Sequence, residues 1–335
     1  MTHEQLDAEQ QAFAELSPDH ILDAIESLGY YSNGRLLALN SYENRVYQIG
    51  VEDAPLLVAK FYRPQRWTNE AILEEHQFSQ ELHDAEVPVV PPIADDNGHT
   101  LHVHGPYRFA LYPSYGGHTP ELDNPDHLEQ LGQFIGRIHS VSQKKDFQHR
   151  PTLDIKGFGH TPRSYLLECP LMPEHVRHNY EQVSAQLLEK IEQTFARVDD
   201  VTHIRLHGDL HPGNILTRDK AFHIVDLDDA RMGPAVQDIW MLLSGDRPER
   251  TAGLMDVLEG YEQFCEFNTA ELGLIEALRS LRLIHYAYWL AKRWHDPAFP
   301  LAFPWFDSAR FWEEHVQHLR EQLVAMDEEP LRLFP

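Results

Sequence analysis

The chain has 335 residues, and its 28 lysines and arginines against 53 aspartates and glutamates give a formal net charge of −25. Hydrophobic residues make up 42% of the chain and charged residues 24%, values typical of globular proteins, so wholesale disorder is excluded. A strongly acidic surface repels nucleic acid, so we expect no nucleic-acid partner, although a locally positive cleft could still bind phosphate groups.

The length suggests about two domains. Two cysteines exclude a disulfide framework and a cysteine-ligated zinc site, and they fit a reducing compartment. No run of about 18 apolar residues occurs, and the first residues lack the basic start and apolar centre of a secretory signal. We therefore expect a soluble cytoplasmic protein with no membrane partner.

The first part of the chain has the pattern of an antiparallel sheet with an inserted helix. Ser17 precedes a short predicted helix at 18–28, and apolar spacings of three and four predict a second helix over 71–85. Short apolar and aromatic runs separated by polar turns predict strands. Such runs occur at 36–39, 46–49, 56–62, 100–103 and 107–112.

Residues 113–117, Pro-Ser-Tyr-Gly-Gly, mark a change of character. Beyond them the pattern is mainly helical, with one strand-rich segment at 204–225. Helices are expected at 126–141, 174–198, 237–243, 253–267, 270–294 and 308–326. We therefore predict an α+β fold of two lobes, with an N-terminal lobe at 1–112, a hinge at 113–117 and a helical lobe at 118–335.

The segment 206–216, Leu-His-Gly-Asp-Leu-His-Pro-Gly-Asn-Ile-Leu, concentrates polar residues in an apolar setting. Its glycines and proline prevent a regular helix, so we expect a loop between short strands. Asp209 and Asn214 are separated as the base and a metal ligand are in a kinase catalytic loop, and Asp226 follows an apolar run where a second metal-holding aspartate would stand. Such groups suit phosphoryl transfer, because Mg²⁺ prefers oxygen ligands and a separate carboxylate must accept the proton of the attacking hydroxyl.

Two other interpretations of this loop remain open. His207 and His211 could form a zinc pair, but residues four apart share a face only on a helix, which Gly208 and Pro212 disfavour. The loop could also be an ordinary polar connection. That interpretation leaves its acidic and amide residues, embedded in apolar strand-like segments, unexplained.

Residues 207–214, His-Gly-Asp-Leu-His-Pro-Gly-Asn, resemble the H-G-D-x-H-x-x-N loop of the aminoglycoside phosphotransferase and choline kinase superfamily, relatives of protein kinases. Longer stretches resemble one branch, the bacterial stress response kinase A family. These stretches are Leu39–Tyr47, Lys60–Pro64, Glu74–Phe78, Asp226–Arg231 and Gly233–Asp238. The resemblance covers nearly the whole chain and implies a two-lobed protein-kinase-like fold, with nucleotide bound by the N-terminal lobe and the acceptor by the helical lobe.

The resemblance also implies roles for single residues of the loop. Asp209 would be the catalytic proton acceptor, and Asn214 and Asp226 would hold Mg²⁺, with Asp226 also counted as catalytic. His211 could donate toward the transferring phosphate or, as a neutral histidine, hold the loop.

Lys60 is the expected partner of the ATP phosphates, because a lysine inside an apolar strand is costly to bury unless it meets an anion. Its ion-pair partner is expected on the following helix, and helical spacing favours Glu75 over Glu74. We expect Asp228 and Asp229 to bind nearby backbone or solvent rather than the metal.

The remaining nucleotide contacts are expected from two loops. Ser41 lies in the segment that replaces the glycine-rich loop of protein kinases, where its hydroxyl and the backbone N–H groups could cap phosphates. Tyr112 and Ser114 lie where a hinge would offer hydrogen bonds to adenine.

The implied function is an ATP- and Mg²⁺-dependent kinase that phosphorylates serine and threonine hydroxyls of proteins in bacterial stress response, and we expect a monomer. The first alternative is a kinase of small alcohols of the choline, homoserine or aminoglycoside type. The second is a nucleotide-binding pseudokinase adaptor, which the presence of a catalytic base disfavours. Aromatic residues between 286 and 312 could cage a cationic substrate or form helical core.

Overall fold

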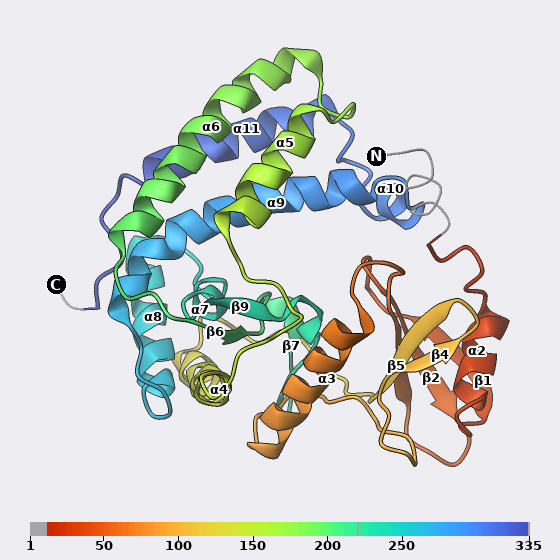
Figure 1. The fold of residues 1–335 in the computed structure, drawn as a ribbon. Helices are drawn as coiled ribbons and strands as arrows, with labels where there is room; N and C mark the ends of the chain where they lie inside the picture. The colour runs from red at the N-terminus through yellow and green to blue at the C-terminus, as the bar shows by residue number, and fades with distance from the viewer. Residues whose placement is uncertain (1–11, 220, 334–335) are drawn as a thin grey trace. The chain divides into compact units, whose positions relative to one another are not determined.

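The computed structural model describes residues 12–219 and 221–333, which divide into two compact units (Figure 1). Unit 1 combines the residues up to 121 with the stretches 147–150 and 209–230. Unit 2 contains residues 122–146, 151–208 and those from 231 onward. The fold is a mixed one, with an antiparallel sheet in unit 1 and mainly helices in unit 2, as the sequence predicted.

Unit 1 is built on a five-stranded antiparallel sheet with the strand order β1-β2-β3-β5-β4. The strands are β1 (Ser32–Ala38), β2 (Arg45–Val51), β3 (Leu57–Phe61), β4 (His102–His104) and β5 (Tyr107–Pro113). On the central strand β3, Lys60 lies between Val46 of β2 and Ala110 of β5. All the predicted strands of this region are confirmed, although β1 begins four residues earlier than expected.

Two helices cover the two faces of this sheet (Figure 1). Helix α2 (Pro18–Glu26) begins at Ser17, whose hydroxyl accepts the N–H of His20, and its apolar face packs on the side of the sheet that carries Phe61 and Phe109. Helix α3 (Asn69–Asp84) packs on the side that carries Ala110, because neighbouring residues of a strand point to opposite faces.

A hairpin from much later in the chain completes unit 1. Its strands β7 (Ile215–Arg218) and β8 (Ala221–Ile224) pair with each other. The N–H of Ile224 donates to the carbonyl oxygen of Pro88 over 2.7 Å. Thr217 and His118 exchange two backbone hydrogen bonds in addition. The sequence assigned these strands to the helical lobe, whereas here they pack with the sheet unit.

Unit 2 consists of helices around one small two-stranded sheet of β6 (His203–Leu206) and β9 (Arg231–Pro234). The helices are α4 (Pro125–Ser142), α5 (Thr161–Leu167), α6 (Glu174–Arg197), α7 (Gln237–Trp240), α8 (Arg247–Tyr261), α9 (Ile275–Arg293), α10 (Ala298–Ala302) and α11 (Ala309–Ala325). Helices α4 and α8 approach closely. Gly132 and Gly260 permit this approach, because a side chain at either position would clash with the backbone of the facing helix.

The largest difference from the predicted elements is at α8, which begins six residues earlier than expected. Asp246 and Glu249 form a capping box there, with the Asp246 carboxylate accepting the N–H of Glu249 and the Glu249 carboxylate accepting the N–H of Asp246. Strand β9 and helices α5 and α10 were not predicted. All three are short segments, for which periodicity is a weak signal.

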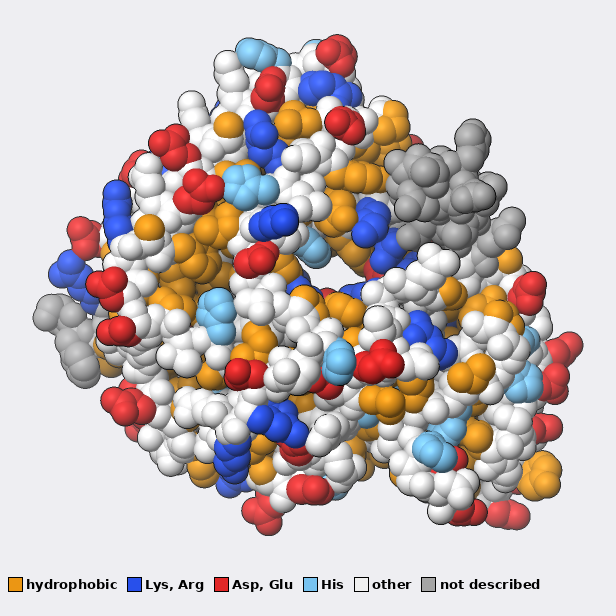
Figure 2. All heavy atoms as spheres, viewed as in Figure 1, with side chains coloured by type: hydrophobic (Ala, Val, Ile, Leu, Met, Phe, Trp, Pro, Cys, Tyr) orange, Lys and Arg blue, Asp and Glu red, His pale blue; other side chains and the backbone are white. Residues whose placement is uncertain are grey.

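Three features of composition can be followed in the structure. Acidic side chains are spread over the face drawn in Figure 2 rather than gathered in one patch. The aromatic residues near the C-terminus are partly core, since Phe306 and Trp312 are fully buried, while Trp305 is 43% exposed. In the described part of the chain, every helix is too short or too polar to cross a membrane.

Candidate active site

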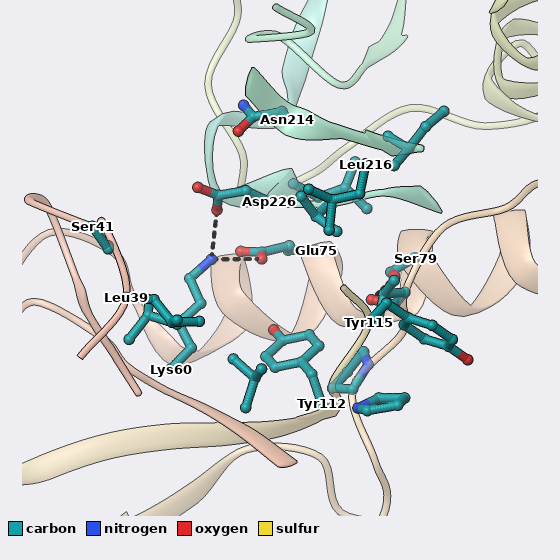
Figure 3. Close-up of a pocket in the computed structure, with 18 of the residues that line it drawn as sticks. Leu39, Ser41, Lys60, Glu75, Ser79, Tyr112, Tyr115, Asn214, Leu216 and Asp226 are labelled. Carbon is teal, nitrogen blue, oxygen red and sulfur yellow. Dashed lines mark hydrogen bonds and ion pairs between the residues drawn. The ribbon is translucent and has the colours of Figure 1, made fainter. Parts of the chain in front are cut away.

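A cavity of about 310 Å³ lies within unit 1 (Figure 3). Apolar strand residues such as Val58 and Ile224 line one part of it. Charged and polar side chains meet at the other part, where they come from the β1–β2 loop, β3, α3 and the two ends of the β7–β8 hairpin. These side chains are Ser41, Lys60, Glu75, Asn214 and Asp226.

Lys60 points inward and is only 6% exposed. Its Nζ lies 3.3 Å from a carboxylate oxygen of Glu75, 3.2 Å from one of Asp226 and 3.1 Å from one of Asp228. Burial acts to lower the pKa of Lys60, but the three carboxylates outweigh it and hold that pKa well above its usual value. Lys60 is therefore a fully charged cation inside the cavity, available to an anionic ligand.

The two neighbouring glutamates of α3 have different partners. Glu75 is buried and forms the ion pair with Lys60, as helical spacing favoured. Burial raises the pKa of Glu75, although Lys60 opposes this rise. The Glu74 carboxylate instead accepts the backbone N–H groups of the three residues 148–150.

Hydrogen bonds join Asn214 to the backbone of Asp209 and of the residue before Asp226, and Asn214 and Asp226 both line the cavity. The side-chain amide of Asn214 donates to the carbonyl oxygen of Asp209 over 3.0 Å, and the N–H of Val225 donates to the carbonyl oxygen of Asn214 over 3.0 Å. Because the amide nitrogen of Asn214 is used in this bond, its side-chain oxygen is the atom left to bind a cation. Figure 3 shows Asn214 and Asp226 projecting into the same end of the cavity.

Asp226 has a left-handed backbone conformation with φ of 63°. For a residue other than glycine this conformation costs of the order of 1 kcal/mol and persists only where the surroundings enforce it. It lies between strand β8 and the single turn η3 (Leu227–Asp229), and its side chain is 52% exposed. The carboxylate is thus fixed at the cavity but remains accessible to a ligand.

Asn214 and Asp226 fit a small divalent cation. An amide oxygen and a carboxylate are hard ligands of the kind that Mg²⁺ prefers. Mg²⁺ keeps several water molecules and takes phosphate oxygens as further ligands, so two protein ligands beside Lys60 suit a metal that bridges a nucleotide.

The expectation that Asp228 binds nearby backbone or solvent is wrong, because its carboxylate pairs with two cationic side chains. It is 4% exposed, and besides Lys60 it pairs with Arg66, whose Nη1 lies 2.7 Å from its carboxylate. Burial raises the pKa of Asp228, but Arg66 and Lys60 outweigh it and hold this pKa at about 2. Arg66 also binds Asp229 over 2.9 Å. Sequence reasoning missed Arg66, since an arginine in a polar turn gives no signal of burial.

The loop residue His211 lies next to Asp209. Its Nδ1 accepts the N–H of Gly213 over 2.9 Å, and its Nε2 lies 3.6 Å from a carboxylate oxygen of Asp209. This geometry suits the loop-holding role that the sequence left open beside phosphate binding. Ser41 lines the cavity, and its hydroxyl donates to the carbonyl oxygen of Asn44 over 3.2 Å.

The two hinge residues differ in their surroundings. Tyr112 lines the cavity, and its hydroxyl is hydrogen-bonded to that of Tyr62 over 3.1 Å. Ser114 does not line the cavity, and its N–H already donates to the carbonyl oxygen of Leu56. The contact of Ser114 with adenine stays a prediction. Tyr115 also lines the cavity, with its ring stacked on His223 at 4.0 Å.

The start of the loop is held within unit 2. Asp238 is fully buried and accepts the N–H groups of His207 over 2.7 Å and Gly208 over 2.8 Å. His139 lies 3.3 Å from the same carboxylate. Asp238 thus braces the two residues that directly precede Asp209.

The sequence is similar to those of known proteins over most of its length. The model of the phosphotransferase enzyme family matches residues 35–275. The chain is 46% identical to stress response kinase A of Escherichia coli K12 over 323 residues, which cover 96% of this chain and 97% of that protein. It is 45% identical to the serine/threonine protein kinase RdoA of Salmonella typhimurium LT2, with the same coverage.

Solved structures share the fold at low identity. An amicoumacin kinase in complex with AMP-PNP, Ca²⁺ and Ami matches with a TM-score of 0.74 and 19% identity, covering 100% of this chain and 98% of its own. A microcompartment-associated aminopropanol kinase matches with a TM-score of 0.70 and 18% identity, covering 93% of this chain and 99% of its own.

Proposed function

Because the chain belongs to the phosphotransferase enzyme family and to its stress response kinase A branch, we propose that it transfers the γ-phosphate of ATP to serine and threonine hydroxyls of proteins during stress. It is a kinase with a hydroxyl acceptor; the protein acceptor, the Mg²⁺ dependence and the single-residue roles are the proposal. One observation carries it: a buried Lys60–Glu75 ion pair lies in the same cavity as Asn214 and Asp226.

Nucleotide binding is assigned to unit 1. The Lys60 ammonium group would leave Asp226 for the α- and β-phosphates while Glu75 keeps it in place. Ser41 and the backbone of its loop would contact the phosphates, and Tyr112 and Tyr115 would contact the base. The apolar part of the cavity suits a purine ring, which gains from burial and stacking.

Asn214 and Asp226 would hold the Mg²⁺ ion, which supplies charge neutralisation to the phosphates when bound. The Asp209 carboxylate would orient the acceptor hydroxyl and accept its proton as the oxygen attacks phosphorus. His211 keeps the backbone of this loop folded beside Asp209. The transfer leaves ADP and a phosphorylated hydroxyl.

The acceptor class is tested with labelled ATP and a panel of proteins and small alcohols, including choline, homoserine and an aminoglycoside. We expect label in serine and threonine residues of protein, and none after Asp209→Asn. Turnover of a small alcohol without protein labelling would refute the protein acceptor, and nucleotide binding without any transfer would favour the adaptor alternative.

A further inference from the structure

Arg150 enters the candidate site from a distant stretch of the chain. Residues 147–150 lie between α4 and α5 in the sequence but pack in unit 1. The Glu74 carboxylate accepts the N–H groups of Gln148 over 2.6 Å, His149 over 2.8 Å and Arg150 over 2.9 Å. One carboxylate on α3 therefore fixes the backbone from which the Arg150 side chain projects.

On one side, the Arg150 guanidinium holds the turn that follows Asp226. Its Nε donates to the carbonyl oxygen of Ala230 over 2.8 Å, and its Nη2 donates to that of Leu227 over 3.4 Å and also to that of Asp228. These carbonyl groups belong to a single short turn and the residue after it, and the Leu227 carbonyl oxygen also accepts the N–H of Ala230 over 2.9 Å.

On the other side, the same guanidinium holds helix α3. Its Nη1 lies 3.4 Å from a carboxylate oxygen of Glu75 and 3.4 Å from the carbonyl oxygen of Ala71. The group also lies over the ring of Trp67 at 4.3 Å, and Arg150 as a whole is 5% exposed. A single planar cation thus connects the residue that pairs with Lys60 to the turn that carries Asp226.

The contacts of Arg150 stabilise the segment that follows the strained backbone of Asp226. The left-handed conformation of Asp226 requires the next residues to run in a fixed direction, and Arg150 binds three carbonyl groups in that segment. If the turn relaxed, the Asp226 carboxylate would move away from Asn214 and from Lys60. Residues that orient a metal ligand in this way change metal affinity or activity by about 10–100-fold when they are removed.

We propose that Arg150 is a positioning residue that sets the place of the metal-binding carboxylate of Asp226 relative to the Lys60–Glu75 pair. The inference rests on the proposed nucleotide and metal site. Arg150 touches neither nucleotide nor acceptor in this assignment; it acts through the turn and through Glu75.

The geometry separates this role from simple charge compensation of Glu75. A lysine could supply the positive charge, but its single ammonium group cannot reach the three turn carbonyls and the two α3 acceptors together. Positioning therefore predicts that Arg150→Lys behaves like Arg150→Met. Charge compensation predicts that Arg150→Lys restores the wild-type behaviour.

The test compares Arg150→Lys, Arg150→Met and the control Arg35→Met, which removes an exposed arginine from β1 of the same unit. ATP binding is measured by calorimetry over a range of Mg²⁺ concentrations and without Mg²⁺, together with kcat and KM. We expect both Arg150 variants to need about 10–100-fold more Mg²⁺ for tight ATP binding and to lose kcat, with metal-free ATP binding within about threefold of wild type. Rescue by lysine, or an unchanged Mg²⁺ requirement, would overturn the proposal.

Glu74→Gln provides a second variant, because it leaves the buried arginine in place. It weakens the hydrogen bonds to the backbone of residues 148–150 and leaves the contacts of the buried Arg150 guanidinium possible, so the chain should fold even if Arg150→Met does not. We expect the Mg²⁺ requirement to rise severalfold, and an unchanged requirement would again refute positioning. Failure of the wild-type protein to bind ATP in an Mg²⁺-dependent manner would instead refute the proposed function itself.

Discussion

Replacing Lys60 by methionine tests the electrostatic organisation of the site most directly. Methionine keeps most of the apolar length of the side chain but removes the ammonium group that lies within 3.3 Å of Glu75, Asp226 and Asp228. Removing one partner of a buried ion pair destabilises a protein by about 3–5 kcal/mol, because the remaining charge stays buried without compensation.

The structure indicates the lower end of that range. Asp228 keeps Arg66 at 2.7 Å, Glu75 keeps Arg150 at 3.4 Å, and the half-exposed Asp226 can be solvated by water. We therefore expect Lys60→Met to lower the free energy of unfolding in urea by about 3 kcal/mol. The exposed control Lys156→Met should change it by less than about 0.5 kcal/mol.

A second substitution and a change of pH complete this test. Lys60→Met/Glu75→Gln should regain at least about 1 kcal/mol, because the two sites are coupled. Burial already raises the pKa of Glu75, and loss of Lys60 raises it further. The folded variant then binds a proton that the unfolded chain binds only near pH 4.3, so its stability relative to the wild-type protein should increase as the pH falls toward 4.3. A loss below about 1 kcal/mol, with no gain at lower pH, would refute this account of the buried charges.

Three further outcomes are expected. Asp209→Asn should lower kcat by about 10²–10⁴-fold and leave Mg²⁺–ATP affinity within about threefold, and equal losses of binding and turnover would show that Asp209 is misassigned. Asn214→Ala should weaken ATP binding in calorimetry only when Mg²⁺ is present. His76 has a pKa lowered to about 3, mainly by burial, so the unfolded state takes up a proton first below about pH 6.5 and stability is lost as the pH falls toward 3. His76→Gln should reduce this loss by about 1.4 kcal/mol at pH 5.5 in urea unfolding, whereas the exposed control His83→Gln should not.

Local patterns in the sequence were sufficient for most of the fold. Helix α2 was predicted from Ser17 and the apolar residues that follow it, because a cap and a periodic face act within a few residues. The start of α8 was predicted wrongly. Its capping box at Asp246 precedes a region of weak apolar periodicity, so the apolar residues further on dominated the prediction.

Some residues of the site could be predicted from the sequence, because their function requires a particular charge at a particular place in the chain. Lys60 was chosen because a cation in an apolar strand needs an anionic partner, and Asp226 because it follows an apolar run at the place of a metal-holding aspartate; the structure pairs these two. Arg66 and Arg150 were missed for the opposite reason. Each lies beside a polar turn, so the burial of Arg150 and the partial burial of Arg66 arise only from tertiary contacts with segments far along the chain.

Helical geometry selected Glu75 rather than Glu74 as the ion-pair partner of Lys60, and the structure has this pair. Residues seven apart share a helix face, and Leu82 is buried as the argument required. What the spacing could not indicate is the use of Glu74, whose three backbone partners lie more than seventy positions away.

Unit 1 is assembled from three separate stretches of the chain, which has a consequence for folding during synthesis. The ribosome releases the residues up to 121 well before strand β8, which arrives with its contact to Pro88 only about a hundred residues later. Until Ala230 has emerged, Lys60 would lack Asp226 and Asp228, and the cavity would lack its lining by Ile224. A nascent chain halted before this point should therefore be a target for proteases and chaperones, and a truncated amino-terminal fragment should not mature into a nucleotide-binding module by itself.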